Sequence, residues 1–100
     1  MLSKQRLKFL KGLTHDASPI IWIGQNGLSE NVMLELENAL DHHELVKIKL
    51  RVGDRDEREK ASAQICEHTG AELVQRIGST LTLYRANKDQ PVISFPKGSR

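Results

Sequence analysis

A switch in hydrophobic period near the middle of the chain restricts its fold more than any other feature. From Glu44 onward apolar side chains occupy positions 46, 48, 50 and 52, and basic ones stand between them. Such alternation is typical of a β-strand that turns one face to a core and one to water. Residues 29–42 instead repeat apolar side chains at helical spacing, with Ser29 as N-cap. A chain that changes period in this way predicts an α/β fold.

The remaining segments extend the same alternation of helices and strands. We expect further helices at residues 3–14 and 54–69, and further strands at 20–23, 72–77 and 80–85. The apolar run 20–23 is continuous, which is typical of a strand covered on both faces. Gly70 can end the third helix, and Gly78 suits a tight hairpin between the last two strands. The order α-β-α-β-α-β-β predicts helices packed on one mixed four-stranded sheet.

Length sets the number of domains. One hundred residues suffice for one hydrophobic core and are too few for two. We expect a single compact domain over residues 1–86, followed at 87–100 by a loosely structured tail that is polar and contains Pro91 and Pro96. Three apolar residues could dock this tail on the domain: Val92, Ile93 and Phe95.

Charge is unevenly distributed along the chain, although the net charge is only +2. Residues 1–15 contain no carboxylate, and their basic residues are Lys4, Arg6, Lys8 and Lys11. Residues 29–44 contain no lysine or arginine, and their acidic residues are Glu30, Glu35, Glu37, Asp41 and Glu44. At helical spacing the three lysines share a narrow arc opposite the leucines. The domain should therefore have a basic side suited to a polyanion, although a lysine face that merely improves solubility is an alternative.

Gly24-Gln25-Asn26-Gly27 separates the first strand from the second helix. Two residues without a Cβ let another backbone approach, and the amides that follow Ser29 at the helix start form an anion site. RNA backbone is a natural ligand of such a loop, and we expect positive charge to converge around it so that phosphates can approach the main chain. A plain strand-to-helix turn is the alternative, because two glycines at this spacing are common.

Two further groups of residues leave their roles open. The basic face of the second strand, with Lys47, Lys49 and Arg51, is either another contact surface or pairs with acids of the second and third helices. Trp22 lies within an apolar strand and is expected in the core rather than as a stacking platform for bases.

Catalytic and metal-binding patterns are scarce. Cys66 and His68 lie two apart, and the chain has no second cysteine to complete a zinc site. We find no phosphate-binding P-loop, nucleophile elbow or dinucleotide fingerprint. We therefore expect no enzyme, no cofactor and no metal. The single cysteine and the polar amino terminus predict a cytoplasmic location, and no apolar stretch is long enough for a membrane helix.

Three blocks in order resemble the bacterial YhbY-like members of the CRM family (chloroplast RNA splicing and ribosome maturation). They are Ile23–Ser29 (IGQNGLS), His43–Lys49 (HELVKIK) and Leu83–Arg85 (LYR). The resemblance spans residues 2–86. It implies a CRM-type RNA-binding domain similar in fold to the carboxy-terminal domain of bacterial translation initiation factor three. Many relatives have a lysine inside the glycine loop, and this chain has none there.

The resemblance also implies a function. Stand-alone bacterial members are associated with precursors of the large ribosomal subunit, so we expect a monomeric protein that binds rRNA and assists ribosome assembly. By resemblance Gly24 and Gly27 are the loop glycines, with Gln25 and Asn26 as its exposed middle. The alternative hypothesis is a protein-interaction module that docks through its acidic second helix or its basic second strand.

Overall fold

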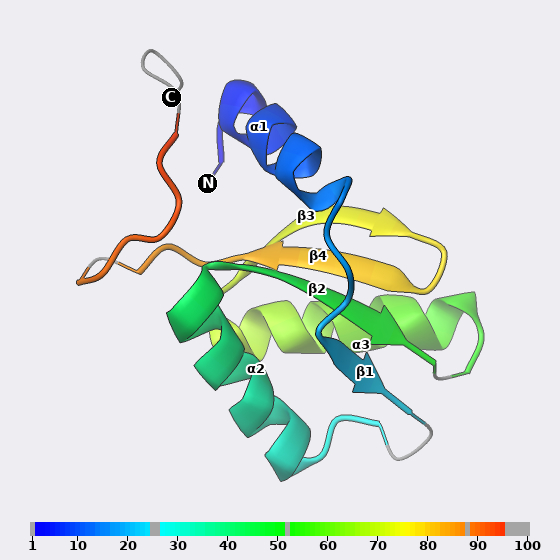
Figure 1. Ribbon diagram of the computed structural model, residues 1–100. Coiled ribbons are helices and arrows are strands. Elements are labelled where there is room, and N and C mark those ends of the chain that lie inside the picture. Colours follow the sequence, from blue (N-terminus) through cyan, green and yellow to red (C-terminus); the bar gives the residue numbers. More distant parts are fainter. Residues whose placement is uncertain (1, 25–26, 52, 88, 96–100) are drawn as a thin grey trace.

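Three helices and four strands follow one another in the predicted order (Figure 1). They lie within residues 2–24, 27–51, 53–87 and 89–95, the part of the chain that this computed structural model describes. The helices are α1 (Lys4–Thr14), α2 (Glu30–His43) and α3 (Arg55–Thr69). The strands are β1 (Ile21–Ile23), β2 (Leu45–Leu50), β3 (Glu72–Ile77) and β4 (Thr80–Tyr84).

The strands form one sheet in the order β1-β2-β4-β3. β1 pairs parallel with β2, whereas the β2–β4 and β3–β4 pairs are antiparallel. The mixed four-stranded sheet predicted from the alternation of periods is therefore confirmed.

Local signals set the helix ends as the sequence predicts. The hydroxyl oxygen of Ser29 accepts a hydrogen bond from Val32 N at 3.2 Å, and the Asp54 carboxylate accepts one from Glu57 N at 3.0 Å. Gly70 ends α3 with φ of 74°, a left-handed conformation that glycine adopts without the clash of a Cβ.

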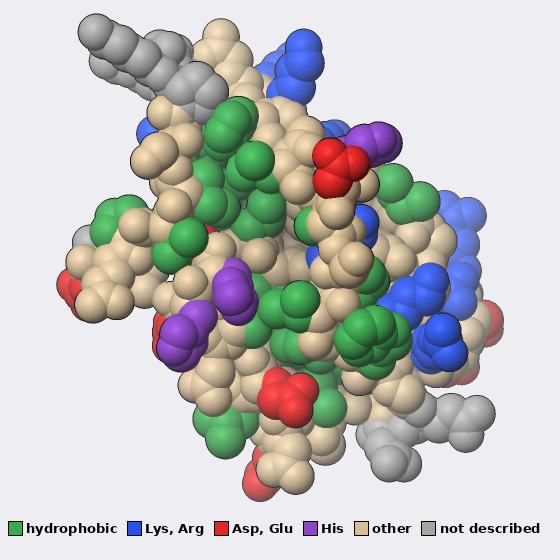
Figure 2. Space-filling model, viewed as in Figure 1, with side chains coloured by type: hydrophobic (Ala, Val, Ile, Leu, Met, Phe, Trp, Pro, Cys, Tyr) green, Lys and Arg blue, Asp and Glu red, His purple; other side chains and the backbone are tan. Residues whose placement is uncertain are grey.

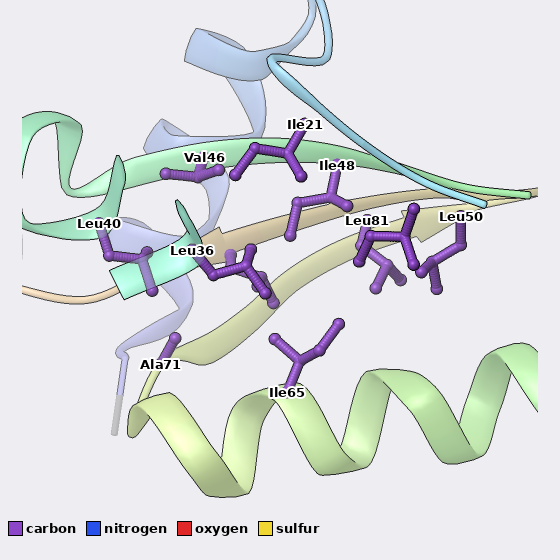
Figure 3. Packing of buried hydrophobic residues seen from close by; sticks show 11 residues of the cluster. Ile21, Leu36, Leu40, Val46, Ile48, Leu50, Ile65, Ala71 and Leu81 are labelled. Carbon is purple, nitrogen blue, oxygen red and sulfur yellow. The ribbon is translucent and has the colours of Figure 1, made fainter. Parts of the chain in front are cut away.

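The main hydrophobic core lies between the sheet and the helices α2 and α3 (Figure 3). The alternating apolar residues of β2, Val46, Ile48 and Leu50, point into it and are almost completely buried. Leu36 and Leu40 of α2 and Ile65 of α3 meet them there. We call this side of the sheet the inner face.

The opposite side, the outer face, is only partly covered. Leu10 of α1 packs on Val74 and Tyr84 at one end of the sheet. Ile93 and Phe95 of the carboxy-terminal segment join this smaller cluster, and the ring centroids of Phe95 and Tyr84 are 5.8 Å apart. Because α1 lies over β3 and β4, the part of the outer face formed by β1 and the far end of β2 stays open (Figure 1).

This partial cover contradicts two expectations about β1. The strand is buried on one face only, and the side chain of Trp22 is 58% exposed instead of lying in the core. The apolar run 20–23 does not distinguish the buried face of β1 from the exposed one, because large apolar side chains occupy both. Tertiary packing decides between them: α2 covers the inner face of β1, and among the described residues no helix covers its outer face.

A buried carboxylate anchors the segment after β4. Glu44 ends α2 with a positive φ of 61° and is only 2% exposed. Its carboxylate accepts hydrogen bonds from the backbone N–H groups of Asn87, Val92 and Ile93 at 2.7, 2.6 and 2.7 Å. Residues 89–95 thus contain no helix or strand and are still attached to the domain. The side chain of Val92 is exposed, whereas Ile93 and Phe95 contact the body. The boundary at residue 86 stays a prediction.

Arg85 joins the end of β4 to two helices. Its guanidinium donates hydrogen bonds to the carboxylates of Glu37 and Asp41 on α2, both at 2.7 Å, and to the carbonyl of Thr69 at 2.8 Å. Burial works against the charged form, but the paired carboxylates outweigh it and raise the pKa of Arg85. The basic residue of the Leu83–Arg85 block therefore holds the fold together.

Candidate nucleic-acid interface

The lysines of α1 point away from the body of the domain. Lys4, Lys8 and Lys11 are all exposed, whereas Leu10 and Thr14 are buried against the sheet. Arg6 lies on a different side of the helix, where its guanidinium sits 4.5 Å above the ring of Phe95. The three lysines thus form a stripe open to a ligand, while Arg6 is engaged with the carboxy-terminal segment.

A cleft of about 250 Å³ connects this stripe to the outer face of the sheet. Lys11 and His15 line it from the α1 side. The sheet forms its floor with polar side chains and one apolar side chain: Lys47, Gln75, Thr80, Thr82 and Ile77. The Lys47 ammonium donates hydrogen bonds to the carbonyls of Thr14 and Ala17, at 3.1 and 2.9 Å, and so holds the segment between α1 and β1 across the sheet.

A row of side chains, one from each strand, crosses the outer face and shares Thr80 and Ile77 with the cleft. The register pairs Trp22 with Lys49, Lys49 with Thr80, and Thr80 with Ile77. Residues paired across a sheet share a face, so all four side chains project from the same side. Trp22 and Ile77, at the two ends of this outer row, are 58% and 65% exposed.

The acidic residues of the two large helices lie on the other side of the sheet. Among the described residues, no carboxylate of α2 or α3 is within ion-pair distance of Lys47, Lys49 or Arg51. The alternative that these cations pair with those acids is therefore wrong for this part of the chain. The reason is topological, because α2 and α3 pack on the inner face and the two lysines project from the outer one.

Three of the five acids of residues 29–44 have structural partners. Glu37 and Asp41 bind Arg85, and Glu44 binds the carboxy-terminal segment. Glu30 and Glu35 are exposed, and neither forms an ion pair with another described residue. The acidic helix is thus a weaker docking surface than its composition indicates.

The glycine loop follows β1 directly. Gly27 N donates a hydrogen bond to Gly24 O at 3.0 Å, and Gly27 has φ of 69°. Gln25 and Asn26, predicted as the exposed middle of the loop, lie outside the described residues. Ser29 is exposed, and its hydroxyl oxygen caps α2. Arg51 N donates to Ile23 O at 2.8 Å, which places the third cation of the second strand beside the loop.

The two loop glycines differ in what the fold requires of them. The left-handed φ of Gly27 strains any side chain placed there. Gly24 has no positive φ and is exposed, and a Cβ added to it would meet no described atom within 4 Å. The chain itself does not need glycine at position 24, so an approaching ligand is a physical reason for one.

We expect Gly24→Ala to separate binding from folding. The substitution should leave the free energy of unfolding unchanged or raise it by about 0.4–1 kcal/mol, because alanine restricts the unfolded chain. It should weaken RNA binding about tenfold or more, since a methyl group would stand where a phosphate approaches the main chain and would cost a charged hydrogen bond. Urea unfolding and RNA binding by anisotropy measure the two effects. Equal RNA affinity in both proteins would exclude close contact at Gly24.

The α1 lysines and the glycine loop are not neighbours. Figure 1 shows α1 at one end of the sheet and the loop beyond β1 at the other. Lysine and arginine side chains lie over both regions in Figure 2, over α1 and near the ends of β1 and β2. The cleft and the outer row lie between them. The cations therefore follow a path across the outer face. This arrangement differs from the expectation that they converge on the glycine loop.

Sequence patterns missed the middle of this path. The apolar run 20–23 predicts Trp22 in the core, and no motif in the sequence indicates the threonines of β4. Their alternation with Leu81 and Leu83 carried the signal, since it predicts a polar outer face for that strand.

In the part of the chain that the structure describes, side chains that would indicate other chemistry are not assembled. Burial raises the pKa of the Cys66 thiol, which disfavours the thiolate that attacks substrates or binds metals. Within the described residues, no three His, Cys, Asp or Glu side chains are grouped to hold a metal ion. None of the described helices has the length and apolar character to cross a bilayer.

Known proteins resemble this chain over almost its whole length. The family model of the CRS1/YhbY (CRM) domain matches residues 2–85. An RNA-binding protein of Haemophilus influenzae is 43% identical over 91% of this chain and 92% of its own length. The Pseudomonas aeruginosa protein named "Probable RNA-binding protein PA4753" is 38% identical over 86% of this chain and 83% of its own. The solution structure of SAV1595 from Staphylococcus aureus superposes with a TM-score of 0.80 at 32% identity, covering 96% of this chain and all of SAV1595. The family match, the sequence identities and the shared fold place this chain in the CRS1/YhbY (CRM) domain family.

Proposed function

We propose that this protein binds RNA without catalysis, by gripping the sugar-phosphate backbone along the outer side of the domain. The binding surface is a basic track that starts at α1, crosses the cleft and the sheet, and ends at the glycine loop. Its cations are Lys4, Lys8, Lys11, Lys47, Lys49 and Arg51. The observation that carries the proposal is the separation of this track from the carboxylates of α2 and α3, which lie on the other side of the sheet.

The dimensions of the track suit a polynucleotide. Lys4 and Lys8 are four residues apart on a helix, which is about 6 Å, and Lys47 and Lys49 are about 7 Å apart along a strand. These distances are similar to the spacing of successive phosphates in an extended strand. Gly24 contributes its exposed main chain at the end of the track, with Gln25, Asn26, Gly27 and Ser29 as the adjoining loop and helix start.

Precursors of the large ribosomal subunit are the proposed target, and assistance to their assembly in the cytoplasm is the proposed role. The names of the relatives support RNA as the partner, and the resemblance of the three sequence blocks to stand-alone YhbY-like proteins supports rRNA. The protein would act as a monomer, because the track needs no residue from a second copy.

Crosslinking the protein to RNA in living cells and mapping the sites tests the target. We expect the crosslinks to concentrate on large-subunit rRNA and its unprocessed precursor. A spread over messenger RNAs in proportion to their abundance would contradict the ribosomal role and leave RNA binding intact.

Docking of a protein partner through the acidic second helix is the competing function. Glu37, Asp41 and Glu44 already bind groups within the domain, so these carboxylates are less available to a protein partner. The basic face of β2 remains available to either kind of partner, and the lysine substitutions described in the Discussion distinguish the two.

A further inference from the structure

The outer row provides two different kinds of contact next to each other. Trp22 offers the face of an indole ring, and its register partner Lys49 offers a cation on the neighbouring strand about 5 Å away. Thr80 continues the row with a hydroxyl group. An aromatic ring, a cation and a hydroxyl are the three kinds of group that can contact the base, the phosphate and the sugar of a nucleotide.

The surroundings of the exposed Trp22 side chain distinguish it from other exposed apolar residues. Single exposed apolar side chains are common on proteins, so the 58% exposure does not by itself define a site. The surroundings add the second observation. Lys49 is the register partner of Trp22 on β2, the cleft with Lys11 and Lys47 adjoins the row, and the carboxylates of α2 and α3 are on the opposite face. An apolar ring within a positively charged surface is complementary to an anionic ligand that has flat apolar faces.

We propose that Trp22 stacks on the base of an unpaired nucleotide while Lys49 binds its phosphate, so that the outer face selects RNA with exposed bases. This inference rests on the proposed function and adds the form of the RNA that is bound. Bases inside a double helix are already stacked on both faces and cannot reach a flat sheet. Loops, bulges and single strands present bases that can.

Fluorescence gives a direct test, because the chain contains one tryptophan and its emission reports on Trp22 alone. The probe is a single-stranded oligoadenylate of about twelve nucleotides, within the range of known single-strand sites. The same strand annealed to its complement is the matched duplex. We expect the single strand to quench Trp22 emission as it binds, with the same midpoint as an anisotropy titration. The duplex should quench less and bind more weakly.

Substitution provides the second measurement. Trp22→Ala should weaken single-strand binding roughly 5- to 150-fold, the range of base–aromatic stacking energies, and Trp22→Phe should recover most of that loss. The slope of affinity against salt should stay as in the parent protein, since stacking releases no counterion. Leu34→Ala is the control, because it removes an exposed apolar side chain, 61% exposed, from α2 on the inner side. It should bind as the parent protein does.

The outcomes separate this inference from the proposed function. RNA binding with unchanged Trp22 emission, or equal affinity of Trp22→Ala and the parent protein, overturns stacking and leaves the basic track standing. Tighter binding of the duplex than of the single strand also overturns it. Absence of binding to either RNA refutes both proposals, and a protein partner lost on Trp22→Ala would then identify the row as a protein-docking surface.

Discussion

Replacing Lys4, Lys8 and Lys11 with glutamine is expected to lower the affinity for single-stranded RNA about 100-fold at roughly 0.1 M salt. The estimate follows from counterion release, in which each contacted phosphate contributes about 0.7 to the slope of log affinity against log salt. At that salt concentration each lost contact then costs about fivefold, and three contacts multiply. The fold should survive, because all three side chains are exposed.

Salt dependence measures the same contacts independently. If about four phosphates are bound, the parent protein should show a slope near −3, and the triple variant should be shallower by about 2. Anisotropy titrations at several salt concentrations give both slopes. Lys60→Gln is the matched control, since Lys60 is an exposed lysine of α3 on the inner side of the sheet. It should change neither the affinity nor the slope by an amount comparable to one track lysine.

A parent protein whose affinity is indifferent to salt would exclude backbone recognition by cations. A triple variant with normal RNA affinity would remove α1 from the track while leaving β2 and the loop as candidates. Loss of a protein partner without loss of RNA binding would favour the protein-interaction hypothesis.

Glu44→Ala should cause the largest loss of stability among the substitutions discussed. Three backbone N–H groups, of Asn87, Val92 and Ile93, would lose a charged acceptor. We expect the free energy of unfolding to fall by about 2–4 kcal/mol, the scale of several hydrogen bonds to a buried charge less what the released segment regains from water. Urea unfolding measures this loss. Hydrogen exchange at Val92 and Ile93 should accelerate even where the domain stays folded.

The positive φ of Glu44 supplies a control for the backbone. Glu44→Gly removes the same carboxylate and relieves the left-handed strain, so it should be more stable than Glu44→Ala by about 1 kcal/mol. Glu35→Ala, at an exposed acid of the same helix, should change stability by no more than about 0.5 kcal/mol. Equal stability of Glu44→Ala and the parent protein would show that the carboxy-terminal segment is not anchored by this carboxylate.

The pH dependence of the anchor has a definite sign. Burial alone would raise the pKa of Glu44, but the amide donors of Asn87, Ile93 and Val92 outweigh it, so the pKa lies below its ordinary value. A lowered pKa in the folded state means that the contribution is fully present above the ordinary pKa of glutamate and is lost as the pH falls through the lowered one. The stability difference between the parent protein and Glu44→Ala should therefore shrink in acid.

The sequence predicts most elements of the interface, each one separately. The lysine stripe of α1, the glycine loop and the basic positions of β2 each follow from spacing within one element. Their arrangement was not visible, and the expectation that cations gather at the loop differs from the path that the fold creates. The prediction of Trp22 in the core is wrong for the same reason, because an apolar run does not indicate which face of the strand a helix will cover.

The sequence by itself determined the order of elements, the helix ends and the buried face of β2. These features depend on interactions within a few residues: caps at Ser29 and Asp54, a left-handed Gly70, and alternation along β2. Only the tertiary structure decided that α1 leaves part of the outer face open, that Arg85 joins β4 to two helices, and that Glu44 binds residues almost fifty positions away. Those outcomes depend on which surfaces pack together, and the periodicity of one segment does not specify which other segment packs on it.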